Sequence, residues 1–332
     1  MSISGGGHVP VLVAESLAAL ALRADGVYVD ATFGRGGHSR AILEALGAHG
    51  RVIAIDRDPA ALAAASSIED PRFTFRHARF SDVAEVLDAL HVGAIDGVLL
   101  DLGVSSPQLD DAMRGFSYRH DGPLDMRMDP SDGESAAAFI ARASTAELTE
   151  VIRDYGEERF AQSVARAIAK AREVEPILTT RRLAHVVAQA VGSRTRGDWN
   201  QDPAARTFQA VRIAVNDELQ QVSIALPLLT ARLASGGRLA AISFHSLEDR
   251  IVKRFFAFAS RPFGGDERVA RLPIREDALP RAPLATVGRA IKASEAEAAR
   301  NPRARSAVLR VAERTPHPLP ADWPRGFAGS GR

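Results

Sequence analysis

Val27-Tyr28-Val29-Asp30 leads into a glycine-rich turn, Gly34-Arg35-Gly36-Gly37-His38, and Asp56 follows twenty positions after Gly36. A second apolar run, residues 52–55, directly precedes Asp56. An open α/β sheet grips a nucleoside with this order of strand, glycine turn, helix, strand and acid. Glycines let the backbone approach the ligand, and the acid accepts hydrogen bonds from ribose hydroxyls. The stretch therefore predicts a nucleoside cofactor, without saying which one.

The composition is that of an ordinary globular protein. The chain has 332 residues, 46% of them hydrophobic and 25% charged, enough for one large or two moderate domains. Its apolar runs, such as residues 93–100, are too short to span a membrane, and the N-terminus lacks the basic start of a secretory signal. The absence of cysteine excludes disulfides and thiolate metal sites. We expect a cytoplasmic protein that does not associate with membranes.

Charge is distributed unevenly along the chain. From Arg250 onward there are 17 Lys and Arg against 8 Asp and Glu, whereas residues 1–249 carry 25 against 33. A basic C-terminal part points to a polyanionic partner. A GC-rich genome, which favours arginine and alanine, explains the same composition equally well.

The first hundred residues alternate between strands and helices. Apolar strands are expected at 27–31, 51–56, 73–77 and 94–100, and helices at 12–22, 39–46, 59–66 and 82–90. Nearly continuous apolar strands between helices are typical of a parallel sheet covered on both faces. The pattern predicts an α/β, doubly wound, mostly parallel sheet.

The alternation stops after Gly103. A polar loop at 105–132 is followed by four helical stretches, at 136–143, 145–155, 159–173 and 180–191. A long helix at 209–233 and strands at 238–244 and 307–312 then resume the pattern. We expect a discontinuous sheet domain, an inserted all-helical domain and a Pro/Gly-rich disordered tail, with the bounds 1–108 and 208–314, 109–207, and 315–332 respectively.

Polar residues follow several of the expected strands. They are Asp30, Asp56, Phe80 with its polar neighbours, Asp101, and the run from Ser243 to His245. The carboxyl ends of parallel strands meet at one edge, where sheets of this class bind ligands. Each residue alone could be a cap or turn residue, but the recurrence favours a functional site.

Two cofactor classes fit the glycine turn. A dinucleotide enzyme usually has G-x-G-x-x-G facing a pyrophosphate, which Asp30 would repel. The turn here reads G-x-G-G-H, and a carboxylate suits the sulfonium and amino groups of S-adenosylmethionine. The sign of the charge favours the methyl donor.

Long motifs resemble one known family. They are HVPVL at 8–12, DATFGRGGHS at 30–39, DLGVSSPQLDDAMRGFSYRHDGPLDMRMD at 101–129, SFHSLEDRIVK at 243–253 and NPRARSAVLRVAER at 301–314. The chain resembles the bacterial S-adenosylmethionine-dependent methyltransferases that modify the N4 amine of a cytidine in the decoding region of small-subunit (16S) ribosomal RNA. The resemblance covers nearly the whole chain except the tail.

The resemblance implies a cofactor site. Gly36, Gly37 and His38 would hold the methionine end of S-adenosylmethionine, Asp56 the ribose and Phe80 the adenine, and Asp101 and Gln108 would line the same pocket. The sequence around Phe80 matches the family least. The family also implies a methyltransferase sheet with an inserted helical domain, a homodimer, and 16S rRNA within the small ribosomal subunit as the partner.

The chemistry requires a proton acceptor. The N4 lone pair of cytosine is delocalised into the ring, so an acceptor must take the N–H proton while nitrogen is aligned with the methyl group. Asp101 is the first candidate, although it could serve the cofactor instead, and Ser243 and His245 are the others. His245 is equally well explained as a structural or RNA-contacting residue. No His/Asp/Glu cluster has metal-ligand spacing, so no metal is expected.

Two arginine-rich segments are candidates for RNA contact. One has Arg194, Arg196 and Arg206 interrupted by Trp199 and Phe208, and the other has Arg300, Arg303, Arg305 and Arg310. Arginine both stacks on bases and bridges phosphates. The inserted domain would grip the RNA and splay the cytidine into the pocket.

Other functions remain open. A DNA or small-molecule amino-methyltransferase would use the same sheet, although the Pro-Pro-aromatic motif typical of DNA enzymes is missing after the fourth strand. A non-catalytic RNA-binding ribosome assembly factor that retains the pocket is the alternative from another class, and a dehydrogenase is more remote.

Overall fold

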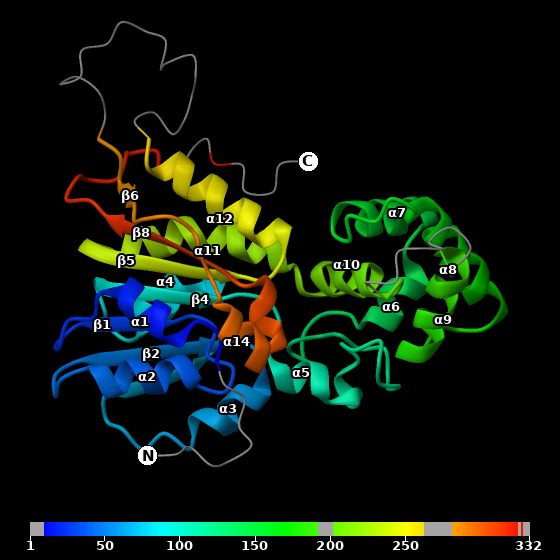
Figure 1. The fold of residues 1–332 in the computed structure, drawn as a ribbon, viewed down its shortest axis with the longest axis horizontal. Helices are drawn as coiled ribbons and strands as arrows, with labels where there is room; N and C mark the ends of the chain where they lie inside the picture. Colours follow the sequence, from blue (N-terminus) through cyan, green and yellow to red (C-terminus); the bar gives the residue numbers. More distant parts are fainter. Residues whose placement is uncertain (1–9, 192–201, 262–280, 325–326, 328–332) are drawn as a thin grey trace, which may run out of the picture. The chain divides into compact units, whose positions relative to one another are not determined.

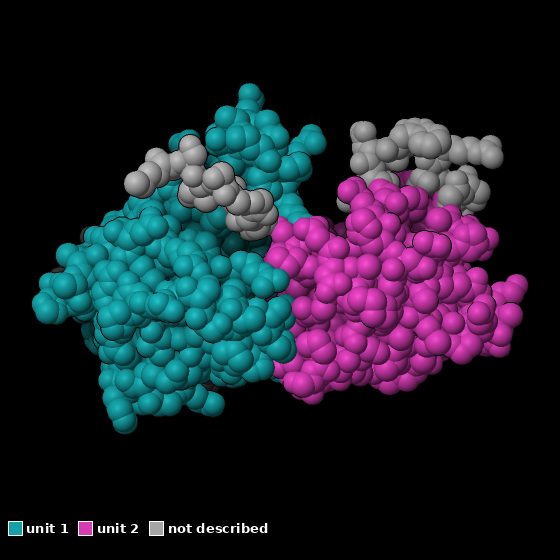
Figure 2. All heavy atoms as spheres, turned by 90° about the horizontal axis from the view of Figure 1, so that it is seen from below, with its two compact units in different colours: residues 1–103, 219–332 teal, residues 104–218 magenta. Residues whose placement is uncertain are grey.

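The computed structural model describes residues 10–191, 202–261, 281–324 and 327 (Figure 1). The chain forms two compact units, coloured separately in Figure 2. Residues 1–103 and 219–332 make the sheet unit, and residues 104–218 make the helical unit. The observed boundaries thus lie at 103/104 and 218/219, where the sequence suggested 108/109 and 207/208.

The sheet unit contains one eight-stranded sheet in the order β3-β2-β1-β4-β5-β8-β6, with β7 also paired to β8. Strands β1 to β5 are parallel, and β8 runs antiparallel to β5, β6 and β7. The strands are β1 (Val27–Asp30), β2 (Arg51–Asp56), β3 (Phe73–His77), β4 (Ile95–Asp101), β5 (Leu233–Ser243), β6 (Leu284–Thr286), β7 (Ile291–Lys292) and β8 (Val308–Arg314). This topology confirms the expected doubly wound, mostly parallel sheet.

Helices flank this sheet (Figure 1). They are α1 (Val13–Leu20), α2 (Gly37–Ala45), α3 (Pro59–Ala65), α4 (Val83–Ala89), α11 (Glu218–Arg232), α12 (Ser246–Ala259) and α14 (Glu295–Arg300), with the 3-10 turns η1 (Phe80–Asp82) and η5 (Pro302–Ser306). The central strands are fully buried, as at Ile53, Val98 and Leu99, which are 0% exposed. Burial on both faces explains why these strands read as continuous apolar runs.

The strand order reverses direction at β1. From there the chain passes to β2 and β3 on one side and later to β4 and β5 on the other. Asp30, the last residue of β1, is aligned with Ala54 of β2 and Leu99 of β4. The carboxyl ends of β1, β2 and β4 are therefore neighbours, at the position where open α/β sheets bind ligands.

The helical unit has its own core. Its helices are α5 (Ser106–Asp110), α6 (Ala136–Arg142), α7 (Thr145–Asp154), α8 (Ala161–Val174), α9 (Thr180–Val191) and α10 (Ala205–Asn216), with the 3-10 turn η2 (Ala112–Arg114). Leu148, Ile152, Val164 and Ile168 are 0% exposed and belong to one apolar cluster. The described part of this unit contains one isolated bridge, Pro123 to Thr179, and no strand. The expectation of an all-helical insertion is confirmed.

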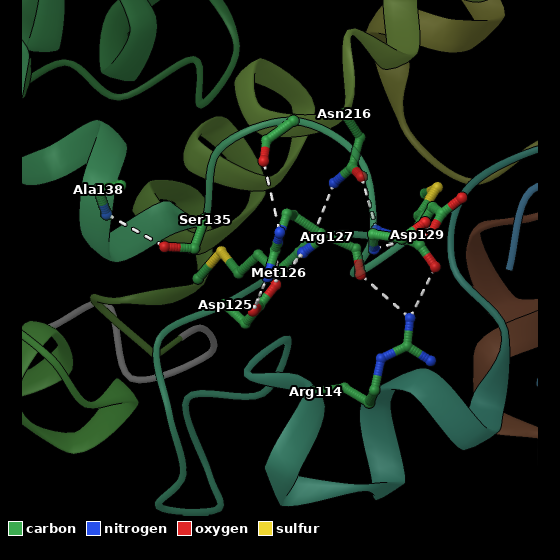
Figure 3. A network of polar contacts seen from close by, with 11 residues as sticks. Arg114, Asp125, Met126, Arg127, Asp129, Ser135, Ala138 and Asn216 are labelled. Atoms are coloured by element: carbon green, nitrogen blue, oxygen red, sulfur yellow. Dashed lines mark hydrogen bonds and ion pairs between the residues drawn. The ribbon is translucent and has the colours of Figure 1, made fainter. Parts of the chain in front are cut away.

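Internal hydrogen bonds hold the long polar loop of this unit (Figure 3). Arg114 donates through Nη2 to the backbone carbonyls of Arg127 (3.0 Å) and Met128 (2.8 Å). Asp125 accepts both Nε and Nη2 of Arg127, at 2.9 and 2.7 Å. The loop therefore has a defined shape although it carries little regular structure.

The single helix expected at 209–233 is wrong. Asp217 has φ 51°, in the left-handed region, and separates α10 from α11. The chain turns there because Asn216 directs its side-chain amide to the loop carbonyl of Met126. Helix α10 instead contributes Phe208 and Val211 to the core of the helical unit.

The disordered tail expected at 315–332 is wrong for its described part. Trp323 donates its indole N–H to the Pro227 carbonyl at 3.1 Å, and its ring lies 6.0 Å from Phe255 and 5.9 Å from Phe258. The high proline and glycine content of the segment predicted disorder, although Trp323 packs against the aromatic residues of α12. Across the described ranges, no helix combines the length and apolarity needed to cross a membrane.

Candidate active site

Asp30 lies at the end of β1 and is almost completely buried, with 1% exposure. Its Oδ2 accepts a hydrogen bond from Ser39 Oγ at 2.6 Å, and Oδ1 accepts the Thr32 backbone N–H at 3.3 Å. Burial raises the pKa of Asp30 to about 6, although the bonds from Ser39 and Thr32 favour the charged form. Asp30 thus places a carboxylate that resists ionisation beneath the glycine turn.

The glycines permit close packing of the turn. Gly36 has φ +77°, and a Cβ there would lie 2.6 Å from the Phe33 ring. At Gly37 a Cβ would come within 2.5 Å of the Pro10 ring. The turn leads directly into α2, and a side chain at either position would clash with the protein's own residues, so the turn requires glycine here.

Asp56 connects the second strand to the turn. Its Oδ2 accepts the Gly34 N–H at 2.7 Å and its Oδ1 accepts the Asp58 N–H at 2.8 Å. Burial raises the pKa of Asp56 to about 6, against the effect of these two bonds. Each oxygen keeps a lone pair, so Asp56 retains the capacity to bind ribose hydroxyls.

Asp101 ends β4, next to the turn. Its backbone N–H donates to Thr32 Oγ1 at 2.6 Å, and its Oδ2 lies 3.7 Å from Nδ1 of His38. Among the described residues, the buried Oδ1 has no hydrogen-bond partner. Burial raises the pKa of Asp101 to about 6, while the nearby His38 lowers it. One oxygen of this carboxylate is therefore left without a partner among the described residues.

The three carboxylates form one electrostatic cluster. Asp30 raises the pKa of both Asp56 and Asp101, because like charges disfavour ionisation. In the part of the chain that the structure describes, no Lys or Arg forms an ion pair with any of the three. A positively charged ligand would relieve this repulsion. The site thus fits S-adenosylmethionine, whose sulfonium and ammonium groups carry positive charge.

Ser243 and His245 lie at the end of β5. Ser243 is 1% exposed, and its Oγ has no hydrogen-bond partner among the described residues. His245 is the N-cap of α12: its Nδ1 accepts the Glu248 N–H at 3.4 Å, and Glu248 Oε2 accepts the His245 N–H at 3.3 Å. This reciprocal cap gives His245 a structural role. A catalytic role for either residue remains a prediction.

Phe80 and Gln108 are the two remaining predicted cofactor residues. Phe80 begins η1 after β3 and is half-buried. Gln108 lies in α5 of the helical unit, is buried, and accepts the Ser105 N–H at 2.8 Å in a capping box. The capping box gives the Gln108 side chain a structural role at the start of α5. Contact of Gln108 with the cofactor remains a prediction.

The arginine-rich segments are only partly available for RNA. Arg310 forms a two-bond ion pair with Asp249, at 2.7 and 2.9 Å. Phe208 is 3% exposed and packs against Tyr118, so it cannot stack on a base. Arg300 and Arg305 are exposed. Arg194, Arg196 and Trp199 lie outside the described residues.

Three polar residues of the site were not among the residues predicted from the sequence. Thr32 holds the backbone of Asp101, Ser39 holds the side chain of Asp30, and Glu248 influences the pKa of Asp101. Thr32 and Ser39 lie within the DATFGRGGHS motif, so their hydroxyls beside the acid were a usable signal. Glu248 reads as an ordinary acid in the first turn of a helix.

The chain is similar to known proteins over most of its length. A family model described as the MraW methylase family matches residues 6–315. Proteins named ribosomal RNA small subunit methyltransferase H are 59% identical in Thiobacillus denitrificans, over 92% of this chain and 97% of theirs, and 60% identical in an Azoarcus species, over 92% and 96%. A solved rRNA methylase from Streptococcus thermophilus is far more distant, with 12% identity and a TM-score of 0.40 over 93% of this chain and 99% of its own. The chain belongs to the MraW methylase family.

Proposed function

We propose that this protein transfers a methyl group from S-adenosylmethionine to the N4 amine of one cytidine in the decoding region of 16S rRNA. The relatives named ribosomal RNA small subunit methyltransferase H support the RNA class. The observation that carries the chemistry is the Asp101 carboxylate, which forms no hydrogen bond through its side chain to any described residue, beside two other strand-end carboxylates. It offers a proton acceptor within a cluster that attracts a cation.

The amine needs help from the protein. When bound, S-adenosylmethionine supplies an activated methyl group on a positively charged sulfur. Asp101 would accept an N4 proton, which makes the nitrogen lone pair available for reaction. Asp56 and the backbone at Gly36 and Gly37 would hold the donor, so that reacting atoms are aligned before the chemical step.

The helical unit would recognise the RNA. A base inside folded RNA cannot reach a buried carboxylate, so the target cytidine must leave its stack. The exposed arginines Arg206, Arg300 and Arg305 offer phosphate contacts on the two units. We further propose a cytoplasmic homodimer, which light scattering of the purified protein at several concentrations would test.

One experiment tests the proposed reaction. Small ribosomal subunits from cells lacking this enzyme are incubated with the protein and labelled S-adenosylmethionine, and the modified base is mapped by mass spectrometry. Label on cytidine N4 is expected. Absence of label in cytidine would contradict the proposal and favour an assembly factor, and label on a DNA substrate would favour a DNA methyltransferase.

A further inference from the structure

His38 is the second residue of α2 and is 5% exposed. Its Nε2 lies 3.0 Å from the backbone carbonyl oxygen of Val11. Because a carbonyl oxygen can only accept, Nε2 must carry a hydrogen. This contact fixes the tautomer, and Nδ1 is left as the nitrogen that can gain or lose a proton.

Nδ1 faces Oδ2 of Asp101 at 3.7 Å. An unprotonated Nδ1 would direct its lone pair at a carboxylate, and the two negative ends would repel. One shared proton removes this conflict, either on Nδ1 or on the carboxyl group. The other charged groups that face Asp101 are Asp30 and Glu248, and both are acids that favour a positive neighbour.

Hydrogen bonds hold the backbone next to His38's partner, Val11, and the backbone of Asp101. Behind His38, Val11 is 3% exposed, and the next residue, Leu12, donates its N–H to Glu297 Oε1 at 2.7 Å. On the other side, Thr32 holds the Asp101 backbone. The distance between Nδ1 and Oδ2 exceeds a hydrogen bond by less than 1 Å. Catalytic contacts of this kind often shorten only when substrate is bound.

We propose that His38 is a positioning residue that orients Asp101 and receives, at Nδ1, the proton that Asp101 takes from the substrate amine. The inference rests on the proposed function, because it needs an N–H to be removed. As the N–C bond forms and the C–S bond breaks, the C–S electron pair stays on sulfur. The N–H proton moves to Oδ2 of Asp101, the oxygen that lies 3.7 Å from Nδ1 of His38. The same proton then passes to Nδ1 of His38, and the imidazolium releases it to water after the product leaves.

The charges favour this order of events. A positive charge on His38 is less favourable while a sulfonium lies beside the carboxylates than after the methyl group has been transferred. Methyl transfer neutralises the sulfur, and Nδ1 can then take the proton. The positive charge thus moves from the donor to His38, and the carboxylate of Asp101 is regenerated for the next turnover.

The variant that tests the proposal is His38→Gln. The glutamine amide can still donate to the Val11 carbonyl, but it cannot take up a proton. We expect kcat at saturating donor to fall about tenfold or more, while the KM for RNA changes less than about threefold. Because His38 lowers the pKa of Asp101, the acid limb of the kcat profile should also move to higher pH. His49→Gln, at an exposed position of the same unit, is the matched control and should behave as wild type.

A second measurement needs neither activity nor donor. In imidazole ¹⁵N NMR of the full chain, Nε2 of His38 should give the signal of a protonated nitrogen. The Nδ1 signal should shift in Asp101→Asn. An Nε2 without a hydrogen, or wild-type kcat and pH profile in His38→Gln, would overturn the proposal. If wild type places no methyl group on cytidine, the proposed function fails, and the NMR result still decides whether the two residues share a proton.

Discussion

Asn216, the last residue of α10, bonds to Met126 and Met128, about ninety positions earlier in the chain (Figure 3). Its Nδ2 donates to the Met126 carbonyl at 2.7 Å, and its Oδ1 accepts the Met128 N–H at 2.8 Å. Met126 is 0% exposed and has φ +61°, which is unusual for a side chain of this size. The amide of Asn216 thus holds the family motif at 101–129 in a strained conformation.

Asn216→Ala should destabilise the helical unit. The substitution leaves a backbone donor and a buried backbone acceptor unpaired, at a cost of about 2–3 kcal/mol in the free energy of unfolding. Urea denaturation monitored by circular dichroism measures this. Gln162→Ala, at an exposed position of α8, is the control and should change stability by less than about 0.5 kcal/mol. Equal effects at the two positions would show that the loop does not depend on the amide.

Gly115 and Gly133 separate backbone strain from steric clash. Both have φ +72°, so alanine is strained at either position. A Cβ at Gly115 would lie 2.2 Å from the Pro123 carbonyl oxygen, whereas one at Gly133 would meet nothing within 4 Å. Gly133→Ala should cost roughly 1 kcal/mol, and Gly115→Ala at least about 2 kcal/mol more. Thermal unfolding of the two variants provides the comparison, and similar losses in both would contradict the clash.

Burial of Asp30 makes stability depend on pH. Its pKa rises from 3.8 to about 6 on folding, so the folded state binds the extra proton between about pH 4 and 6. Ionised Asp30 therefore costs up to about 3 kcal/mol above pH 6, and this cost disappears below about pH 4. Asp30→Asn should be more stable than wild type at pH 8, with the difference vanishing near pH 4. Urea titrations at both pH values test this, and the exposed Asp25→Asn should show no such trend.

The fold was largely predictable because its strands are buried on both faces. Continuous apolar runs such as residues 52–55 indicate a parallel strand without knowledge of its neighbours. An Asp directly before Pro59 is a typical helix start, and the Asp58 side chain accepts the Ala60 N–H at 2.9 Å as the N-cap of α3. The break at Asp217 was not predictable, since it depends on a hydrogen bond to Met126, ninety positions from Asn216.

The site residues at the strand ends could be predicted from the sequence. The contacts that hold them in place were harder to predict. A carboxylate at the end of an apolar strand can be recognised from the sequence, which is why it was possible to predict Asp30, Asp56 and Asp101. The contact of His38 with the Val11 carbonyl could not be read from the sequence, because Pro10 and Gly37 must first bring the two segments together. The role of Arg310 was misread because its partner, Asp249, lies on another element.

Asp56→Asn should weaken donor binding. The amide keeps one acceptor oxygen but loses the charge and one acceptor position for the ribose hydroxyls, while Gly34 and Asp58 still require two acceptors. The Kd for S-adenosylhomocysteine, measured by calorimetry, should rise at least about tenfold, equivalent to about 1.4 kcal/mol. Asp25→Asn provides the charge-matched control. Unchanged binding would remove Asp56 from the cofactor site.

Asp101→Asn should abolish turnover while the protein stays folded. Asparagine has nearly the same shape and keeps the backbone bond to Thr32, but its amide cannot accept the proton of the amine. We expect the rate of methyl transfer to labelled small subunits to fall by roughly 100-fold or more. Calorimetry with S-adenosylhomocysteine separates the two possible roles of Asp101. A lost rate with intact binding assigns it to proton transfer, a lost rate with lost binding assigns it to the cofactor, and full activity removes it from both.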